Sequence, residues 1–163
     1  MSSIPGEHHM TAFIPAHPSM IPSDSTQTMI HGTLVTSTLQ RIAIGDVDTT
    51  MAQAMYIDYE QDFFDVVIHG KAHAVAIWEN NEPRSLDAAD LAAILAAHPP
   101  VGKHPIRLVS CQTWREAASF AQQLANLIDV EVLASTAKIS VYRQRLYFKE
   151  PGSWVLYHPE SWQ

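Results

Sequence analysis

The sequence has a single cysteine, Cys111, among 163 residues. One thiol cannot form an intrachain disulfide framework or a Cys-x-x-Cys metal or redox site. Basic residues are also scarce, with ten Lys and Arg against 17 Asp and Glu and a formal net charge of −7. Such a chain lacks the positive field that attracts phosphate backbones and anionic lipids. We therefore expect neither nucleic acid nor a membrane as a partner.

Long hydrophobic runs are missing too. No segment approaches the roughly 20 apolar residues of a membrane span, and the opening MSSIPGEHHM lacks the basic start and apolar stretch of a signal peptide. These absences predict a protein that is cytoplasmic, or that a dedicated secretion system delivers to a target cell. A hydrophobic content of 47% is present, which is enough for one globular domain with a sizeable core.

The pattern along the chain changes near residue 29. Residues 1–28 contain four of the ten prolines and show no periodicity, which predicts an extended arm ahead of a domain over residues 29–163. Apolar or alternating runs predict strands in 29–45, 63–68, 72–79, 106–110, 130–135, 138–148 and near the end of the chain.

Two helices are expected between these strands. Ser85 is the predicted N-cap of a helix in LDAADLAAILAAH, and a Thr113–Glu116 capping box precedes a second helix. Strands that alternate with helices predict an α/β fold, namely a three-layer sandwich with a mostly parallel central sheet.

Two reactive side chains follow predicted strands directly. His69 comes after the run Phe63–Ile68, and Cys111 comes after Ile106–Ser110. The active groups of parallel sheets lie beyond the carboxyl ends of the strands, so the imidazole and the thiol are expected to meet there. A helix N-terminus and a histidine both favour the thiolate, which predicts Cys111 as a nucleophile and His69 as its base and acid. Gly70 lacks a Cβ, and its N–H and that of Cys111 are the candidate oxyanion hole.

At these residues the sequence resembles the caspase-like cysteine peptidases of clan CD. An apolar strand that ends in His-Gly (DVVIHG) and a later one that ends in a small residue and Cys (IRLVSC) are typical of that group. The segments IRLVSCQTW and FAQQLANLIDVEVLAS look most like the bacterial, toxin-associated and CHAT-like versions. The resemblance covers about residues 63–157 and implies a caspase-like fold, with Cys111 as nucleophile, His69 as general base and Gly70 as an oxyanion donor.

Other residues are candidates for the same site. Trp114 is a candidate wall of the substrate cleft, and Arg143 and Arg145 are candidates for a pocket that takes an acidic side chain; a solvated strand face is the alternative for the arginines. His31-Gly32 is a second His-Gly pair, but it precedes its apolar run. His69 and His73 have the i, i+4 spacing that would suit two zinc ligands on a helix, but Gly70 and the strand-like surroundings argue against a helix there. No metal or cofactor is therefore expected.

Three functions fit these patterns. The first is a caspase-like cysteine protease, a bacterial toxin or effector module that cleaves a peptide or protein through an acyl-enzyme. The second is a glutamine deamidase or transglutaminase-like toxin with the same Cys/His chemistry. The third is an inactive binding module, because Trp114-Arg115 stand where the resembled family has a glycine. A toxin would also have a cognate immunity protein or a host target protein as partner.

Overall fold

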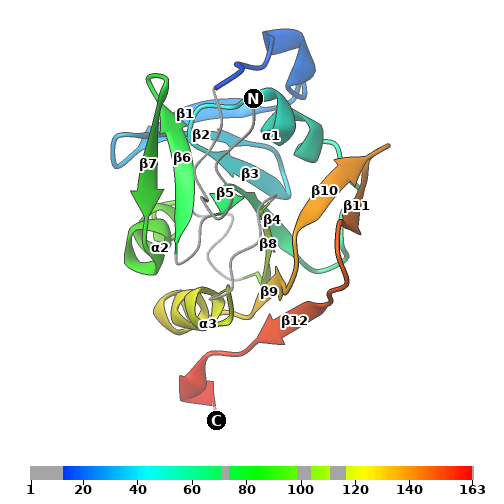
Figure 1. Ribbon diagram of the computed structural model, residues 1–163. Coiled ribbons are helices and arrows are strands. Elements are labelled where there is room, and N and C mark those ends of the chain that lie inside the picture. Colours follow the sequence, from blue (N-terminus) through cyan, green and yellow to red (C-terminus); the bar gives the residue numbers. More distant parts are fainter. Residues whose placement is uncertain (1–12, 71–73, 99–103, 111–116, 163) are drawn as a thin grey trace.

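A computed structural model describes residues 13–70, 74–98, 104–110 and 117–162. Its largest element is a seven-stranded sheet with the order β1-β2-β3-β4-β8-β9-β12 (Figure 1). The strands are β1 (Thr26–Ile30), β2 (Thr33–Ser37), β3 (Arg41–Ile44), β4 (Phe64–Val67), β8 (Ile106–Val109), β9 (Val132–Ser135) and β12 (Trp154–Tyr157). The four strands from β3 to β9 are parallel, whereas β1, β2 and β12 run antiparallel to their neighbours.

The remaining described elements form two small sheets and several helices. β5 (His69–Gly70), β6 (Val75–Glu79) and β7 (Glu82–Leu86) make a three-stranded antiparallel sheet, and β10 (Ile139–Tyr142) and β11 (Arg145–Phe148) make a hairpin. The α-helices are α1 (Thr49–Ala54), α2 (Ala88–Ala96) and α3 (Ala117–Ile128), and the short 3-10 helices are η1 (Pro18–Met20) and η3 (Glu160–Trp162).

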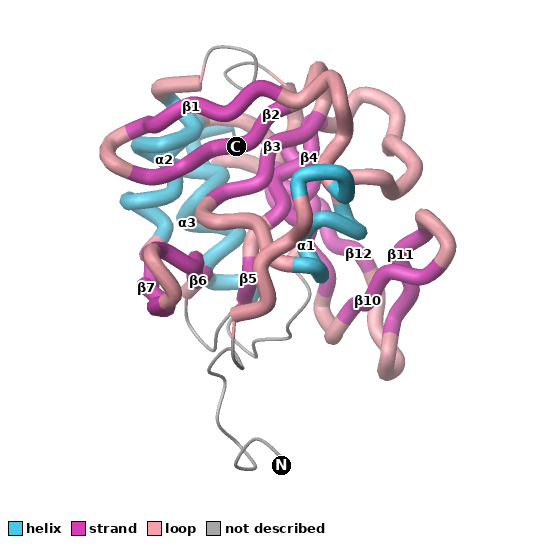
Figure 2. Tube along the Cα trace, turned by 90° about the horizontal axis from the view of Figure 1, so that it is seen from above, coloured by secondary structure: helices cyan, strands magenta, loops and turns pink. Residues whose placement is uncertain are grey.

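Successive residues of the middle strands pack into two different cores. Val66 of β4 belongs to a large cluster with Leu91 of α2, Leu124 of α3 and Ile77 of β6. Val67, the next residue, belongs to a second cluster that also contains residues of α1 and β10. Because side chains alternate along a strand, α2, α3 and the β5–β7 sheet cover one face, and α1 and the β10–β11 hairpin cover the other (Figure 2).

The predicted three-layer sandwich with a mostly parallel, caspase-like sheet is wrong. Of the nine strand pairs in the described residues, three are parallel and six are antiparallel. Three hairpins account for much of this difference, because their two-residue turns have positive φ at both positions, the geometry that joins adjacent antiparallel strands. These turns are His31-Gly32, Asn80-Asn81 and Arg143-Gln144.

The first predicted helix is confirmed, but its start is not at Ser85. Ser85 lies in β7, and the N-cap of α2 is Asp87, whose carboxylate accepts a hydrogen bond from the Asp90 amide at 2.8 Å. The Asp90 carboxylate accepts one from the Asp87 amide in return, which completes a capping box. A helix follows residue 116 as expected, and its buried Phe120, Ala121 and Leu124 pack in the large cluster; the predicted cap at Thr113–Glu116 lies outside the described residues.

Residues 13–25 precede β1 in the described part of the chain. The segment contains η1, and β1 itself begins at Thr26. The division into an arm over residues 1–28 and a domain over 29–163 stays a prediction. Within the described ranges, none of the helices is long and apolar enough to cross a membrane.

Candidate active site

A buried histidine–aspartate pair lies at the carboxyl ends of two neighbouring parallel strands. His69 follows β4 after one residue, and Asp48 lies between β3 and α1. His69 Nε2 is 2.7 Å from Asp48 Oδ2, and both side chains are close to nine-tenths buried. A carboxylate at this distance fixes the ring orientation and the tautomer of a histidine.

Asp48 is held in place because it is also the N-cap of α1. Its Oδ1 accepts a hydrogen bond from the Met51 amide at 2.8 Å, while its Oδ2 faces His69. Both carboxylate oxygens are therefore engaged, one by a helix start and one by an imidazole. The orientation of the carboxylate, and through it that of the His69 ring, follows from the position of α1.

A glycine makes the approach of this segment to β6 feasible. Gly45 has φ +91°, and a Cβ built on it would lie 2.6 Å from Ile77 Cβ. The next residue, Asp46, donates its amide to the Trp78 carbonyl at 2.8 Å. The chain between β3 and α1 is thus fixed against β6, and β6 in turn pairs Ala76 with His69.

The third parallel strand, β8, ends beside the pair. Ile68 donates its amide to the Val109 carbonyl at 3.0 Å, so β4 and β8 remain hydrogen-bonded up to the residue before His69. Ser110 follows, and its Oγ is buried without a hydrogen-bond partner among the described residues. Cys111 and Trp114 come next in the sequence and lie outside the described residues. Gly70 is buried in β5 and pairs with Val75.

The two candidate pocket arginines lie at the other end of the strands. Arg143 is in the β10–β11 turn with its guanidinium 5.2 Å from the Tyr142 ring centroid, and the Arg145 side chain is 82% exposed. The turn is anchored by a hydrogen bond from the Asp58 amide to the Gln144 carbonyl. The structure does not bring these arginines to His69, and their role in a cleft stays a prediction. His31 is exposed in the β1–β2 turn.

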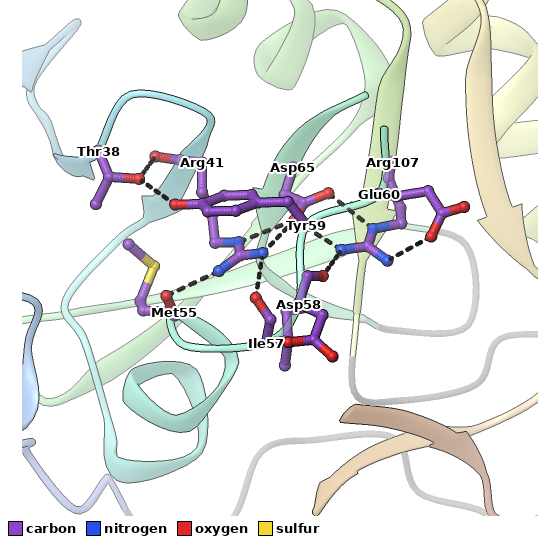
Figure 3. A network of polar contacts seen from close by, with 9 residues as sticks. All are labelled: Thr38, Arg41, Met55, Ile57, Asp58, Tyr59, Glu60, Asp65 and Arg107. Atoms are coloured by element: carbon purple, nitrogen blue, oxygen red, sulfur yellow. Dashed lines mark hydrogen bonds and ion pairs between the residues drawn. The ribbon is translucent and has the colours of Figure 1, made fainter. Parts of the chain in front are cut away.

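A second polar cluster crosses the amino ends of the same three strands (Figure 3). Arg41, Asp65 and Arg107 are register partners on β3, β4 and β8. Asp65 is fully buried, and its oxygens accept hydrogen bonds from Arg41 Nε at 2.9 Å and from Arg107 Nε at 2.7 Å. The Tyr59 ring covers the Arg41 guanidinium at 4.2 Å.

This cluster fastens the segment after α1 to the sheet. Arg41 donates to the carbonyls of Met55 and Ile57, both at 2.8 Å, and Arg107 donates to that of Asp58 at 3.0 Å. Because carbonyls and a carboxylate satisfy the guanidinium groups, we assign the cluster a structural role.

Reasoning from the sequence missed Asp48. The signal available was its place before TTMAQA, since aspartate is a preferred N-cap. Its contact with His69, 21 residues further on, is tertiary and left no pattern in the sequence. No group of three or more His, Cys, Asp or Glu that could hold a metal ion occurs in the residues searched, which are those the structure describes.

Comparison with protein families matches residues 41–153 to a family described as a domain of unknown function (DUF8616). The chain belongs to this family. The part that matches DUF8616 includes Asp48, His69 and Cys111, and it excludes the arm and the β1–β2 hairpin. No curated protein matches the chain, and no solved structure matches it either.

Proposed function

We propose that this chain is a thiol hydrolase that uses Cys111 as nucleophile, His69 as general base and acid, and Asp48 to orient His69. The observation that carries the proposal is the 2.7 Å contact between His69 Nε2 and Asp48 Oδ2 at the carboxyl ends of β3 and β4. In the sequence, Cys111 comes two residues after the end of the next parallel strand, β8.

The chemistry follows from the tautomer that Asp48 favours. A carboxylate at Nε2 accepts the N–H of the ring, which directs the lone pair of Nδ1 toward a proton donor. In the proposed reaction His69 takes the thiol proton, and the thiolate of Cys111 forms a bond to the carbonyl carbon of an amide. His69 then returns the proton to the leaving amine, and water hydrolyses the thioester to release the acid and the thiol.

The amide can come from two kinds of donor. A backbone amide gives peptide-bond cleavage, and a glutamine side chain gives deamidation with the same nucleophile. A split target chain identifies proteolysis, whereas a mass gain of about one dalton identifies conversion of an amide to an acid. A peptide or protein substrate fits both outcomes.

The single cysteine makes the test direct, because alkylation of the chain by iodoacetamide reports on Cys111 alone. An unperturbed thiol has a pKa of about 8.5, so about 1% of it is thiolate at pH 6.5. We expect the parent chain to react at least tenfold faster at pH 6.5 than His69→Gln. Asp48→Asn should slow the reaction in the same direction.

Asp87→Asn is the matched control for Asp48→Asn. Both aspartates cap a helix by accepting the amide three residues ahead at 2.8 Å, but Asp87 caps α2. Asp87→Asn should therefore leave the alkylation rate unchanged. The proposal would be overturned if the alkylation rate of the parent followed the pH profile of an ordinary thiol and if His69→Gln left that rate unchanged.

A further inference from the structure

Residues 13–16 of the arm run as an extended strand beside Asp48. Ala16 donates its amide to the Val47 carbonyl at 3.0 Å, and Ile14 accepts the Thr49 amide at 3.1 Å. Pro15 and Asp48 form the antiparallel bridge between these two hydrogen bonds. Residues 13–16 thus add a short strand to the segment that supplies the carboxylate of the buried pair.

The side chain at the start of this strand, Phe13, packs on β6, the strand that pairs with His69. The Phe13 ring packs against Trp78 with 5.3 Å between ring centroids and an angle of 48°. Trp78 clusters with Ala76, and Ala76 is the register partner of His69. The backbone of the arm therefore follows Asp48 while its aromatic side chain covers the strand that pairs with His69.

Residues 13–16 are held by two hydrogen bonds, by the Phe13 ring and by the packing of Ala16 against the core cluster on the α1 face. Ile14, between Phe13 and Ala16, is 62% exposed. A cavity of about 610 Å³ lies between the arm and the sheet, with Ile21 and Pro22 on one side and Leu34 and Val47 on the other. This volume is in the range of ligand pockets, so the arm does not pack tightly against the sheet over its whole length.

We infer that Phe13–Ala16 occupy the site at which an extended polypeptide substrate binds, beside Val47–Thr49. This segment must detach from the site before the substrate binds. The backbone of Val47–Thr49 offers the hydrogen bonds of strand addition, and the Trp78–Ala76 surface accepts an aromatic side chain. The substrate class is then an extended polypeptide with an aromatic residue at the position of Phe13. The assignment as a substrate rests on the proposed thiol hydrolase, whereas exchange of the arm for another peptide does not.

The test uses the full chain and a fluorescent peptide with the sequence of residues 10–18. The double variant Phe13→Ala/Ala16→Pro removes the ring and the amide donor of the arm in the same molecule. We expect it to bind the peptide at least tenfold more tightly than the parent does, by fluorescence anisotropy. A peptide with alanine in place of the phenylalanine should bind about tenfold more weakly. Ile14→Ala is the matched control, because it changes an exposed side chain of the same strand and should bind like the parent.

Equal peptide binding by the parent and the double variant would overturn the inference, and so would equal binding of the two peptides. Failure of the double variant to fold would also overturn it, because the arm would then be part of the core. Repeating the peptide titration with Cys111→Ala tests the exchange of the arm separately from the thiol hydrolase. If Cys111→Ala still permits peptide binding, and if His69→Gln does not change the alkylation rate, the arm exchange stands and the thiol hydrolase is refuted.

Discussion

Replacing Asp65 with asparagine leaves two buried guanidinium groups without their shared carboxylate. Arg41 and Arg107 contact the two oxygens of Asp65 at 2.7–2.9 Å, and all three side chains are less than one-tenth exposed. Removing one partner of a buried ion pair costs about 3–5 kcal/mol, because the remaining charge stays desolvated. We expect a loss of this size for Asp65→Asn, a large share of the 5–15 kcal/mol that stabilises a typical domain.

Urea unfolding followed by far-UV circular dichroism measures this loss. With an m-value of about 2 kcal/mol/M, the midpoint should fall by about 2 M. Glu60→Gln is the control in the same cluster, since Glu60 is 59% exposed and 3.9 Å from Arg107, and exposed pairs contribute about 0–1 kcal/mol. A midpoint for Asp65→Asn within about 0.3 M of the parent, at unchanged m-value, would refute the view that both arginines depend on this carboxylate.

Three further predictions concern stability. Gly45→Ala should lower the melting temperature more than Gly32→Ala, because both have positive φ but only the Gly45 Cβ would meet neighbouring atoms; equal shifts would contradict this. Burial lowers the pKa of His98 below 6.5, so burial of the neutral imidazole contributes stability above pH 6.5 that is lost as the pH falls. His98→Gln should therefore reduce the decrease of the urea midpoint between pH 7 and pH 5. The same decrease in the parent and in His98→Gln would contradict this prediction. Trp162→Phe removes the indole donor to Asp129 at 2.8 Å and should cost about 1 kcal/mol in urea unfolding, whereas no loss would show that water replaces this bond.

Most of the strands and the helices α2 and α3 were predictable because each has a local signature, whereas β7 and α1 were not predicted. The apolar run before His69 became β4, and the alternating residues 138–148 became the β10–β11 hairpin. Periodicity identifies a strand but does not identify its partner or direction. Residues 72–79 therefore looked like the next strand of a parallel sheet, whereas β6 (Val75–Glu79) pairs antiparallel with β5 and β7 in a separate sheet.

The candidate site was predictable only in part, for the same reason. His69 stood out because a histidine and a glycine follow an apolar run. Asp48 also follows a short strand and a glycine, but only the fold brings its carboxylate to the start of α1 and to His69 in β5. The pairing of Arg41 with Asp65 likewise needed the register of β3 on β4, which no local pattern specifies.

The cluster of Arg41, Asp65 and Arg107 at the amino ends of β3, β4 and β8 also affects where the sequence can vary without loss of the fold. It holds the backbone after α1 at the edge of the sheet away from His69. Changes in loops at the opposite edge leave these contacts intact, provided that Gly45–Asp48, which are fixed against β6 and α1, are kept. New specificities can arise there by insertion or exchange of loops, at little expense to the rest of the structure.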